Sequence, residues 1–234
     1  MATPETLHEA ALHFDLHSDT VRELNRRLHE DAPSGRVLVA NPGGRHAIAA
    51  GLDAPCEVEI GGHVGYYCAG MNKRATVRVR GNCGVGVAEN MMSGTVIVEG
   101  SASQAAGATA RGGLLVIHGD ASARCGISLK GANIVVRGSV GHMSAFMAQT
   151  GSLVVCGDAG EALGDSLYEA RLYVRGTVRS LGADCIEKEM RDEHRAQLAG
   201  LLDRAGIGGD LGGFRRYGSA RQLYTFKVDN VGAY

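Results

Sequence analysis

Two histidines near the N-terminus have a spacing that could bind a metal. His13 and His17 lie four residues apart in the segment HFDLH, so they would share one face if this segment were helical. A zinc site needs further Cys, His or carboxylate ligands at characteristic spacings. No such set accompanies this pair, and we therefore expect no metal site here.

The cysteines are the next candidates for chemistry. No two of them form a Cys-x-x-Cys pair, the spacing typical of zinc ribbons, thioredoxins and ferredoxins. We therefore expect reduced and buried thiols, as in a cytoplasmic protein. The six residues are Cys56, Cys68, Cys83, Cys125, Cys156 and Cys185.

Other reactive patterns are also missing from the sequence. The glycine-rich segment 206–213 follows an expected helix and lacks Gly-Lys-Ser/Thr, so we interpret it as a hinge rather than a phosphate loop. Glu89 and Glu161 are isolated, and no carboxylate pair is evident for acid–base catalysis. We expect no catalytic, cofactor-binding or metal-binding residue on this chain. A solvated face is expected for four outward-facing arginines, Arg78, Arg80, Arg137 and Arg175.

An exact repeat supplies the elements that would position any functional residue. Glycine occurs 35 times in 234 residues, about twice the usual frequency, and seven of these glycines recur every 19 positions. The residues two and four positions before each of these seven glycines are Val, Ile or Leu. This alternation is typical of a strand with one buried face. The repeat glycines are Gly62, Gly81, Gly100, Gly119, Gly138, Gly157 and Gly176.

This repeat predicts an all-β fold, a single-stranded right-handed parallel β-helix of about seven 19-residue coils with short α-helical caps. A unit of 19 residues cannot bury its apolar side alone, so the units must stack. The period is not a multiple of six, which argues against the left-handed hexapeptide helix. Seven residues after each repeat glycine the chain holds only Gly or Ala, which indicates close backbone packing. The column that contains Cys185 is half polar, and either an internal polar ladder or an outward corner would suit it.

The sequence divides into three parts. Residues 1–55 are expected to form an N-terminal cap with a helix at 20–30, a strand at 37–39 and a turn at 41–44. The β-helix itself is expected over residues 56–184.

The third part, residues 185–234, is expected to hold a C-terminal helix and a docking tail. The helix is predicted over 184–205, capped by Asp184 and ended by Gly206. A final strand is predicted over 223–228.

Composition limits the possible partners. The formal net charge is −1, which predicts neither a nucleic-acid-binding surface nor a polybasic membrane signal. No apolar run reaches the ~18 residues of a membrane span, and the N-terminus has no secretory pattern. We therefore expect a cytoplasmic protein.

Four segments resemble the GXGXG domain family over residues 15–185: Asn41–His46, Gly84–Gly94, Ser122–Ser128 and Gly141–Met147. That family includes the C-terminal domain of the glutamate synthase large subunit, a right-handed β-helix without catalytic residues that braces an amidotransferase domain against an FMN-binding domain. A separate chain of this type resembles the GXGXG subunit of N-methylglutamate synthase or the GlxC-type glutamate-synthase-like proteins.

The resemblance implies a non-catalytic structural subunit in a hetero-oligomer. Its partners would be an amidotransferase-like subunit and an FMN-binding subunit, with FMN and an iron–sulfur cluster on the partner rather than on this chain. The implied reaction is the conversion of methylamine and glutamate to N-methylglutamate and ammonia. An alternative that the resemblance leaves open is the GXGXG subunit of a formylmethanofuran dehydrogenase or formyltransferase/hydrolase complex.

Overall fold

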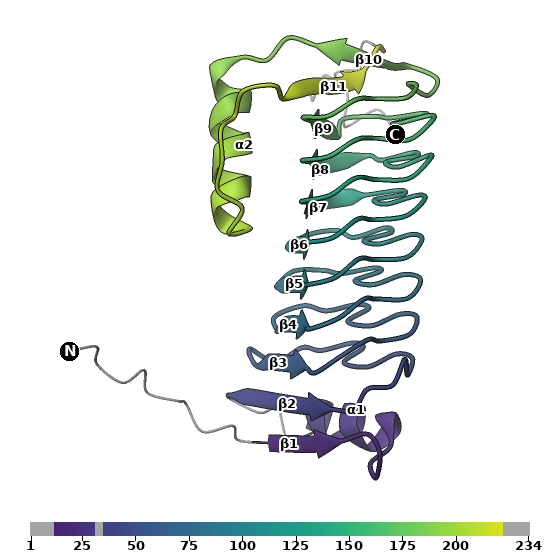
Figure 1. Ribbon diagram of the computed structural model, residues 1–234, viewed down its shortest axis with the longest axis vertical. Helices are drawn as coiled ribbons and strands as arrows, with labels where there is room; N and C mark the ends of the chain where they lie inside the picture. Colours follow the sequence, from purple (N-terminus) through teal and green to yellow (C-terminus); the bar gives the residue numbers. More distant parts are fainter. Residues whose placement is uncertain (1–11, 31–34, 222–234) are drawn as a thin grey trace, which may run out of the picture.

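A computed structural model describes residues 12–30 and 35–221 as a solenoid whose coils stack along one axis (Figure 1). Within these ranges one sheet of eleven strands, ordered β1–β9 and then β11 and β10, runs along one side of the solenoid. The predicted parallel β-solenoid of about seven turns with two short helices is confirmed. Its elements are β1 (Leu12–Asp15), α1 (Val21–Glu30), β2 (Arg36–Ala40), β3 (Glu57–Ile60), β4 (Thr76–Val79), β5 (Thr95–Val98), β6 (Leu114–Ile117), β7 (Lys130–Val136), β8 (Thr150–Val155), β9 (Arg171–Val174), β10 (Cys185–Lys188), α2 (Asp192–Arg204) and β11 (Arg215–Ser219).

Strands β3–β9 pair in parallel in the register that the repeat predicts. Val58 lies opposite Val77, and Val77 lies opposite Val96, so each residue meets its equivalent from the next coil. The one irregular pair among the described strands is β7–β8, where the register shifts between Lys130 and Asn133. These two strands are also the longest, with seven and six residues against four in the other strands from β3 to β9.

The interior of the solenoid is one continuous apolar core, which we call the spine. Branched side chains such as Leu115, Ile117 and Ile134 are completely buried and stack on their equivalents in neighbouring coils. Burying one such side chain stabilises the fold by about 1.5–3 kcal/mol, and the repeat makes this gain in every coil. The core is therefore narrow and needs few aromatic rings.

The corners explain why one column accepts only Gly or Ala. From Ala69 to Gly164, the residues seven positions after the repeat glycines have left-handed backbone, with φ of 56° at Ala88 and 66° at Gly107. A Cβ on Gly107 would also come within 2.6 Å of Cδ1 of Ile134. This position therefore holds only Gly or Ala, because left-handed backbone disfavours larger residues and a larger side chain would point into the filled interior.

The repeat glycines lie backbone on backbone. The N–H of Gly119 donates to the carbonyl oxygen of Gly100 at 2.9 Å, and a Cβ on Gly119 would lie 2.8 Å from the Gly100 carbonyl carbon. The same stacking joins Gly81 to Gly100 and continues upward through Gly138, Gly157 and Gly176.

The N-terminal elements continue the sheet. Strand β1 pairs with β2 and β2 pairs with β3, all in parallel, and α1 lies in the connection between β1 and β2. Leu24 and Leu28 of α1 are buried in the spine, and the N–H of Glu23 donates to Oγ1 of Thr20 at 3.1 Å. The predicted helix, strand and turn of this region are confirmed.

The C-terminal helix prediction was partly wrong. Residues Cys185–Lys188 form strand β10 rather than the first turns of the helix, and α2 begins only at Asp192. The reason is tertiary, because β10 pairs antiparallel with β11, and β11 in turn pairs with β9. This pair closes the end of the sheet. The predicted strand at 223–228 lies outside the described residues.

Candidate functional site

All six cysteines, which lie in the described part of the chain, are buried free thiols, as predicted. Burial raises the pKa of Cys83 and of Cys125 to about 12, and that of Cys185 to about 11. Reactive cysteines usually have a lowered pKa, so the burial and raised pKa of these thiols are typical of cysteines that pack in a core. Cys185 is 5% exposed, but Met71 and Met147 in the same column are 46% and 50% exposed, so this column forms an outward corner. Cys185 is the exception, because it pairs with β11 at the end of the sheet.

The predicted polar candidates do not come together. His13 is exposed on β1 and His17 is exposed in the turn that follows, so the two histidines are not on a helix. Glu161 pairs with Arg179 at 3.0 Å rather than with another carboxylate. Within residues 12–30 and 35–221, no group of three or more His, Cys, Asp or Glu could hold a metal ion. No helix in these ranges is long and apolar enough to cross a membrane.

A polar ladder runs along the stack at the position after each repeat glycine. The N–H of Asn82 donates to Nδ1 of His63 at 2.9 Å, and the N–H of Ser101 donates to Oδ1 of Asn82 at 2.8 Å. Each side chain thereby satisfies an amide of the next coil that would otherwise need water. The ladder continues through Asp120, Ser139, Asp158 and Thr177.

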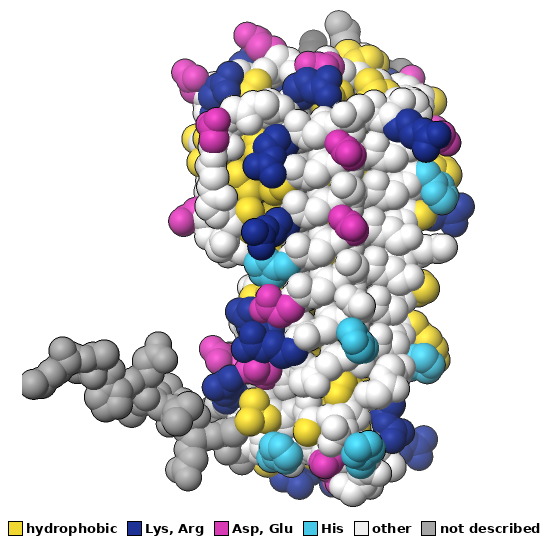
Figure 2. Space-filling model, viewed as in Figure 1, with side chains coloured by type: hydrophobic (Ala, Val, Ile, Leu, Met, Phe, Trp, Pro, Cys, Tyr) yellow, Lys and Arg dark blue, Asp and Glu magenta, His cyan; other side chains and the backbone are white. Residues whose placement is uncertain are grey.

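The outer face of the sheet is charged over its N-terminal strands. Glu59 on β3 accepts a hydrogen bond from Arg36 and another from Nε of Arg80 at 2.7 Å, and Arg78 pairs with Glu99. The guanidiniums of Arg80 and Arg36 lower the pKa of the Glu59 carboxyl. Figure 2 shows basic and acidic side chains gathered here, below the helix.

The same face is apolar over β6–β9, where α2 lies against it (Figure 1). Val135, Val154 and Tyr173 are completely buried, although they occupy the column that carries Glu59 and Arg78 nearer the N-terminus. The outward-facing Arg175 differs from a merely solvated arginine, because its guanidinium lies 5.7 Å from the centre of the Phe214 ring. The cover is formed by Leu198, Leu201, Leu202, Ala205 and Phe214.

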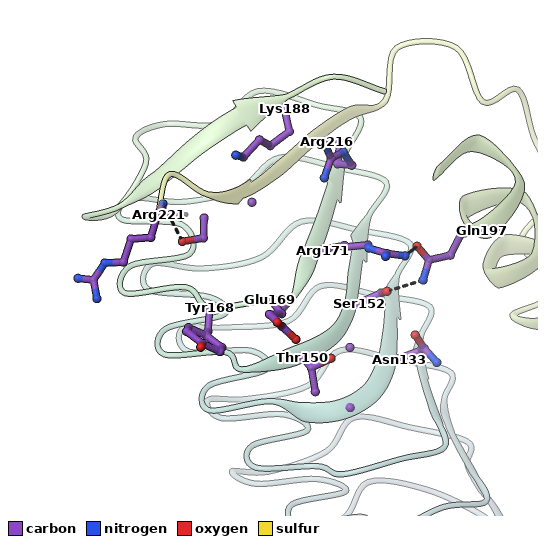
Figure 3. Close-up of a pocket in the computed structure, with 15 residues that line it drawn as sticks. Asn133, Thr150, Ser152, Tyr168, Glu169, Arg171, Lys188, Gln197, Arg216 and Arg221 are labelled. Atoms are coloured by element: carbon purple, nitrogen blue, oxygen red, sulfur yellow. Dashed lines mark hydrogen bonds between the residues drawn. The ribbon is translucent and has the colours of Figure 1, made fainter. Parts of the chain in front are cut away.

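A hollow of about 720 Å³ opens between strands β7–β9, α2 and the β10–β11 pair (Figure 3). One side is formed by Gln197 of α2, whose Oε1 accepts hydrogen bonds from the Tyr173 hydroxyl at 2.7 Å and from Nη1 of Arg171 at 2.8 Å. Its Nε2 donates to Oγ of Ser152 at 3.2 Å. Four cations, Arg171, Lys188, Arg216 and Arg221, line the hollow together with one carboxylate, that of Glu169.

Comparison with known proteins gives the family. No family model matches the sequence. The chain is 62% identical over 226 residues to "Protein GlxC" of Rhizobium meliloti (strain 1021), and the alignment covers 94% of this chain and 99% of that protein. The chain belongs to the GlxC family. The GlxC-type membership that the sequence resemblance included is therefore confirmed, and the likeness takes in the coils and most of both flanks.

The residues that line the hollow could not be recognised from sequence patterns. Arg171, Lys188 and Arg216 belong to three separate strands, and no motif connects them. One signal was available: the outer column changes from Glu59 and Arg78 to apolar residues from Ile97 onward, and a helix-forming segment follows the last coil. That change could have predicted the covering helix, but not the cations beside it.

Proposed function

We propose that this GlxC-family chain is a non-catalytic structural subunit of a glutamate-synthase-like complex. It would hold an amidotransferase-like subunit against an FMN-binding subunit in the cytoplasm. The observation that carries the proposal is the set of large apolar side chains that are exposed at the corners of the solenoid. Surface patches of this kind mark protein–protein contacts.

The exposed corner residues recur in consecutive coils. Tyr66 and Val85 occupy the same corner position one coil apart, and their exposed fractions are 54% and 48%. Tyr66 also stacks on His46 with ring centres 4.0 Å apart, which holds its ring in place. Met71 and Met147, at another corner and four coils apart, are 46% and 50% exposed. Exposed apolar side chains spread along a stiff solenoid suit the binding of a second subunit along its length.

The assembled complex would act as an N-methylglutamate synthase, converting methylamine and glutamate to N-methylglutamate and ammonia. This part of the proposal comes from the resemblance of four segments to the GXGXG domain. FMN and the iron–sulfur cluster would lie on a partner subunit, so this chain would contribute binding and spacing rather than a catalytic group.

Native co-purification tests the proposal. The tagged full chain should bring down an amidotransferase-like chain and a yellow-brown flavin subunit, and the complex should form N-methylglutamate from methylamine and glutamate. The double variant Tyr66→Ser/Val85→Ser should lose at least one partner, while Arg137→Gln should keep both. A chain that purifies without partners, or with an amidohydrolase-like subunit of a formyl-transfer complex, would contradict the proposal.

A further inference from the structure

The hollow beside α2 gathers more positive than negative charge, because only one carboxylate, that of Glu169, lines it beside the cations. Arg171, Lys188 and Arg216 form no ion pair with any carboxylate in the described ranges, whereas Arg221 pairs with Asp184. Figure 3 shows the first three arranged around the space and Arg221 extending away from them. Arg78 and Arg80, on the N-terminal half of the same face, are by contrast paired with carboxylates.

Two of these cations are held in position without losing their charge. Arg171 donates to the amide oxygen of Gln197, and Nε of Arg216 donates to the backbone oxygen of Glu189 at 2.9 Å. Burial lowers the pKa of Arg216; the nearby Arg171 and Arg191 also lower it, whereas Tyr173 and Glu193 raise it, and the guanidinium stays protonated at neutral pH. An anion placed among them would relieve this repulsion.

The backbone also departs from the repeat at this point. The register shift between Lys130 and Asn133 and the extra length of β7 and β8 bring Gly131, Thr150 and Gly151 to the lining of the hollow. β-Bulges recur beside binding sites, where they redirect side chains. The hydroxyls of Thr150 and Ser152 add neutral donors beside the cations.

We propose that this hollow is a binding site for a small polyanion, a molecule with two or more carboxylate or phosphate groups held by Arg171, Lys188 and Arg216. The planar guanidinium matches both kinds of acidic group through paired hydrogen bonds, and the ammonium adds a point charge. A volume of about 720 Å³ lies within the range of small-molecule sites. The site uses only residues of this chain and does not depend on the proposed complex.

Calorimetric titration of the full chain at low ionic strength tests the site. The probes are pyrophosphate and succinate, with acetate as the single-charge comparison. Pyrophosphate or succinate should bind saturably at one site, and acetate should bind at least about 10-fold more weakly. The tighter of the two probes identifies phosphate or carboxylate as the preferred group.

Matched variants separate this site from general charge attraction. Arg171→Gln and Arg216→Gln should each weaken binding by about 10- to 100-fold, whereas Arg137→Gln, on the outer face of the same sheet, should change it less than about 2-fold. Arg171→Lys should weaken binding to an intermediate extent, because lysine keeps the positive charge but lacks the planar guanidinium with its paired hydrogen-bond donors. Unchanged circular dichroism spectra show that each variant is folded. Failure of both probes to bind, or equal binding by Arg171→Gln and Arg137→Gln, would overturn the proposal.

Discussion

The two halves of the outer sheet face differ sharply, although they lie on one sheet. Over β2–β5 the face carries paired charges, among them Glu59 with Arg36 and Arg80. Over β6–β9 the equivalent columns hold Val135 and Val154, which α2 seals from solvent. Inside the solenoid the two halves are the same, because branched aliphatic side chains stack from coil to coil in both.

The difference shows that inward-facing and outward-facing residues of the sheet determine separate properties. Interior residues specify the coil, and they repeat because every coil has the same space to fill. Outer residues are free of that constraint, so one half can remain solvated while the other is built to hold a helix. The hollow with its cations lies at the border of the covered half, where α2 and β11 meet the sheet.

Exchanging the residue types of the two halves should produce the largest effect. Val135→Arg would place an unpaired charge beneath α2 and should lower the free energy of unfolding by roughly 4 kcal/mol or more. The reciprocal variant Arg78→Val, in the same column of the open half, should change it by less than about 1 kcal/mol. Denaturant unfolding measures both, and similar losses in the two variants would show that the halves do not differ as described.

Weakening the helix contact should have an intermediate effect. Leu198 is completely buried against the sheet, so Leu198→Ala should cost about 2–5 kcal/mol. Because Cys156 lies in the same covered cluster, its alkylation should become faster in this variant, while Cys125 in the spine should remain protected. Equal acceleration at both thiols would mean that the cover and the spine open together.

Removing a charge from the open half should have the smallest effect. Glu59→Gln should cost at most about 1 kcal/mol at low salt and almost nothing at a salt concentration of about 1 M, since surface pairs are screened. The lowered pKa of Glu59 stabilises the native state above the ordinary value of 4.5 and ceases to do so as the pH falls through the lower native pKa. Unfolding curves of wild type and variant should therefore converge in acid, and a difference that stays constant as the pH falls would contradict the assigned pairing.

The repeat made the solenoid predictable. Val58, Val77 and Val96 occupy equivalent positions in sequence and therefore in the sheet, and the Gly or Ala column follows from left-handed corners such as Ala88. Helix α1 was also predictable, because Leu24 and Leu28 lie on one face behind a Thr20 cap. These features depend on local sequence or on exact periodicity.

The C-terminal end was less predictable because it depends on contacts between distant segments. Strand β10 resembles part of a helix until β11 pairs with it, and β11, with the sequence RRYGS, has no alternation to reveal a strand. The cations of the hollow meet only through that pairing, since Arg216 of β11 lies opposite Tyr173, close to Arg171 on β9. Sequence periodicity therefore could not place them together.

The backbone contacts between repeat glycines also restrict how a gene for this protein can change. Inserting or deleting one codon within a strand would reverse the alternation of the rest of that strand, turning valines outward and polar residues inward. The shift between Lys130 and Asn133 shows where such a change can be absorbed, because the 19-residue pairing resumes at Asn133. Length can also be gained or lost by duplication or excision of whole coils, in steps of about 4.8 Å along the solenoid.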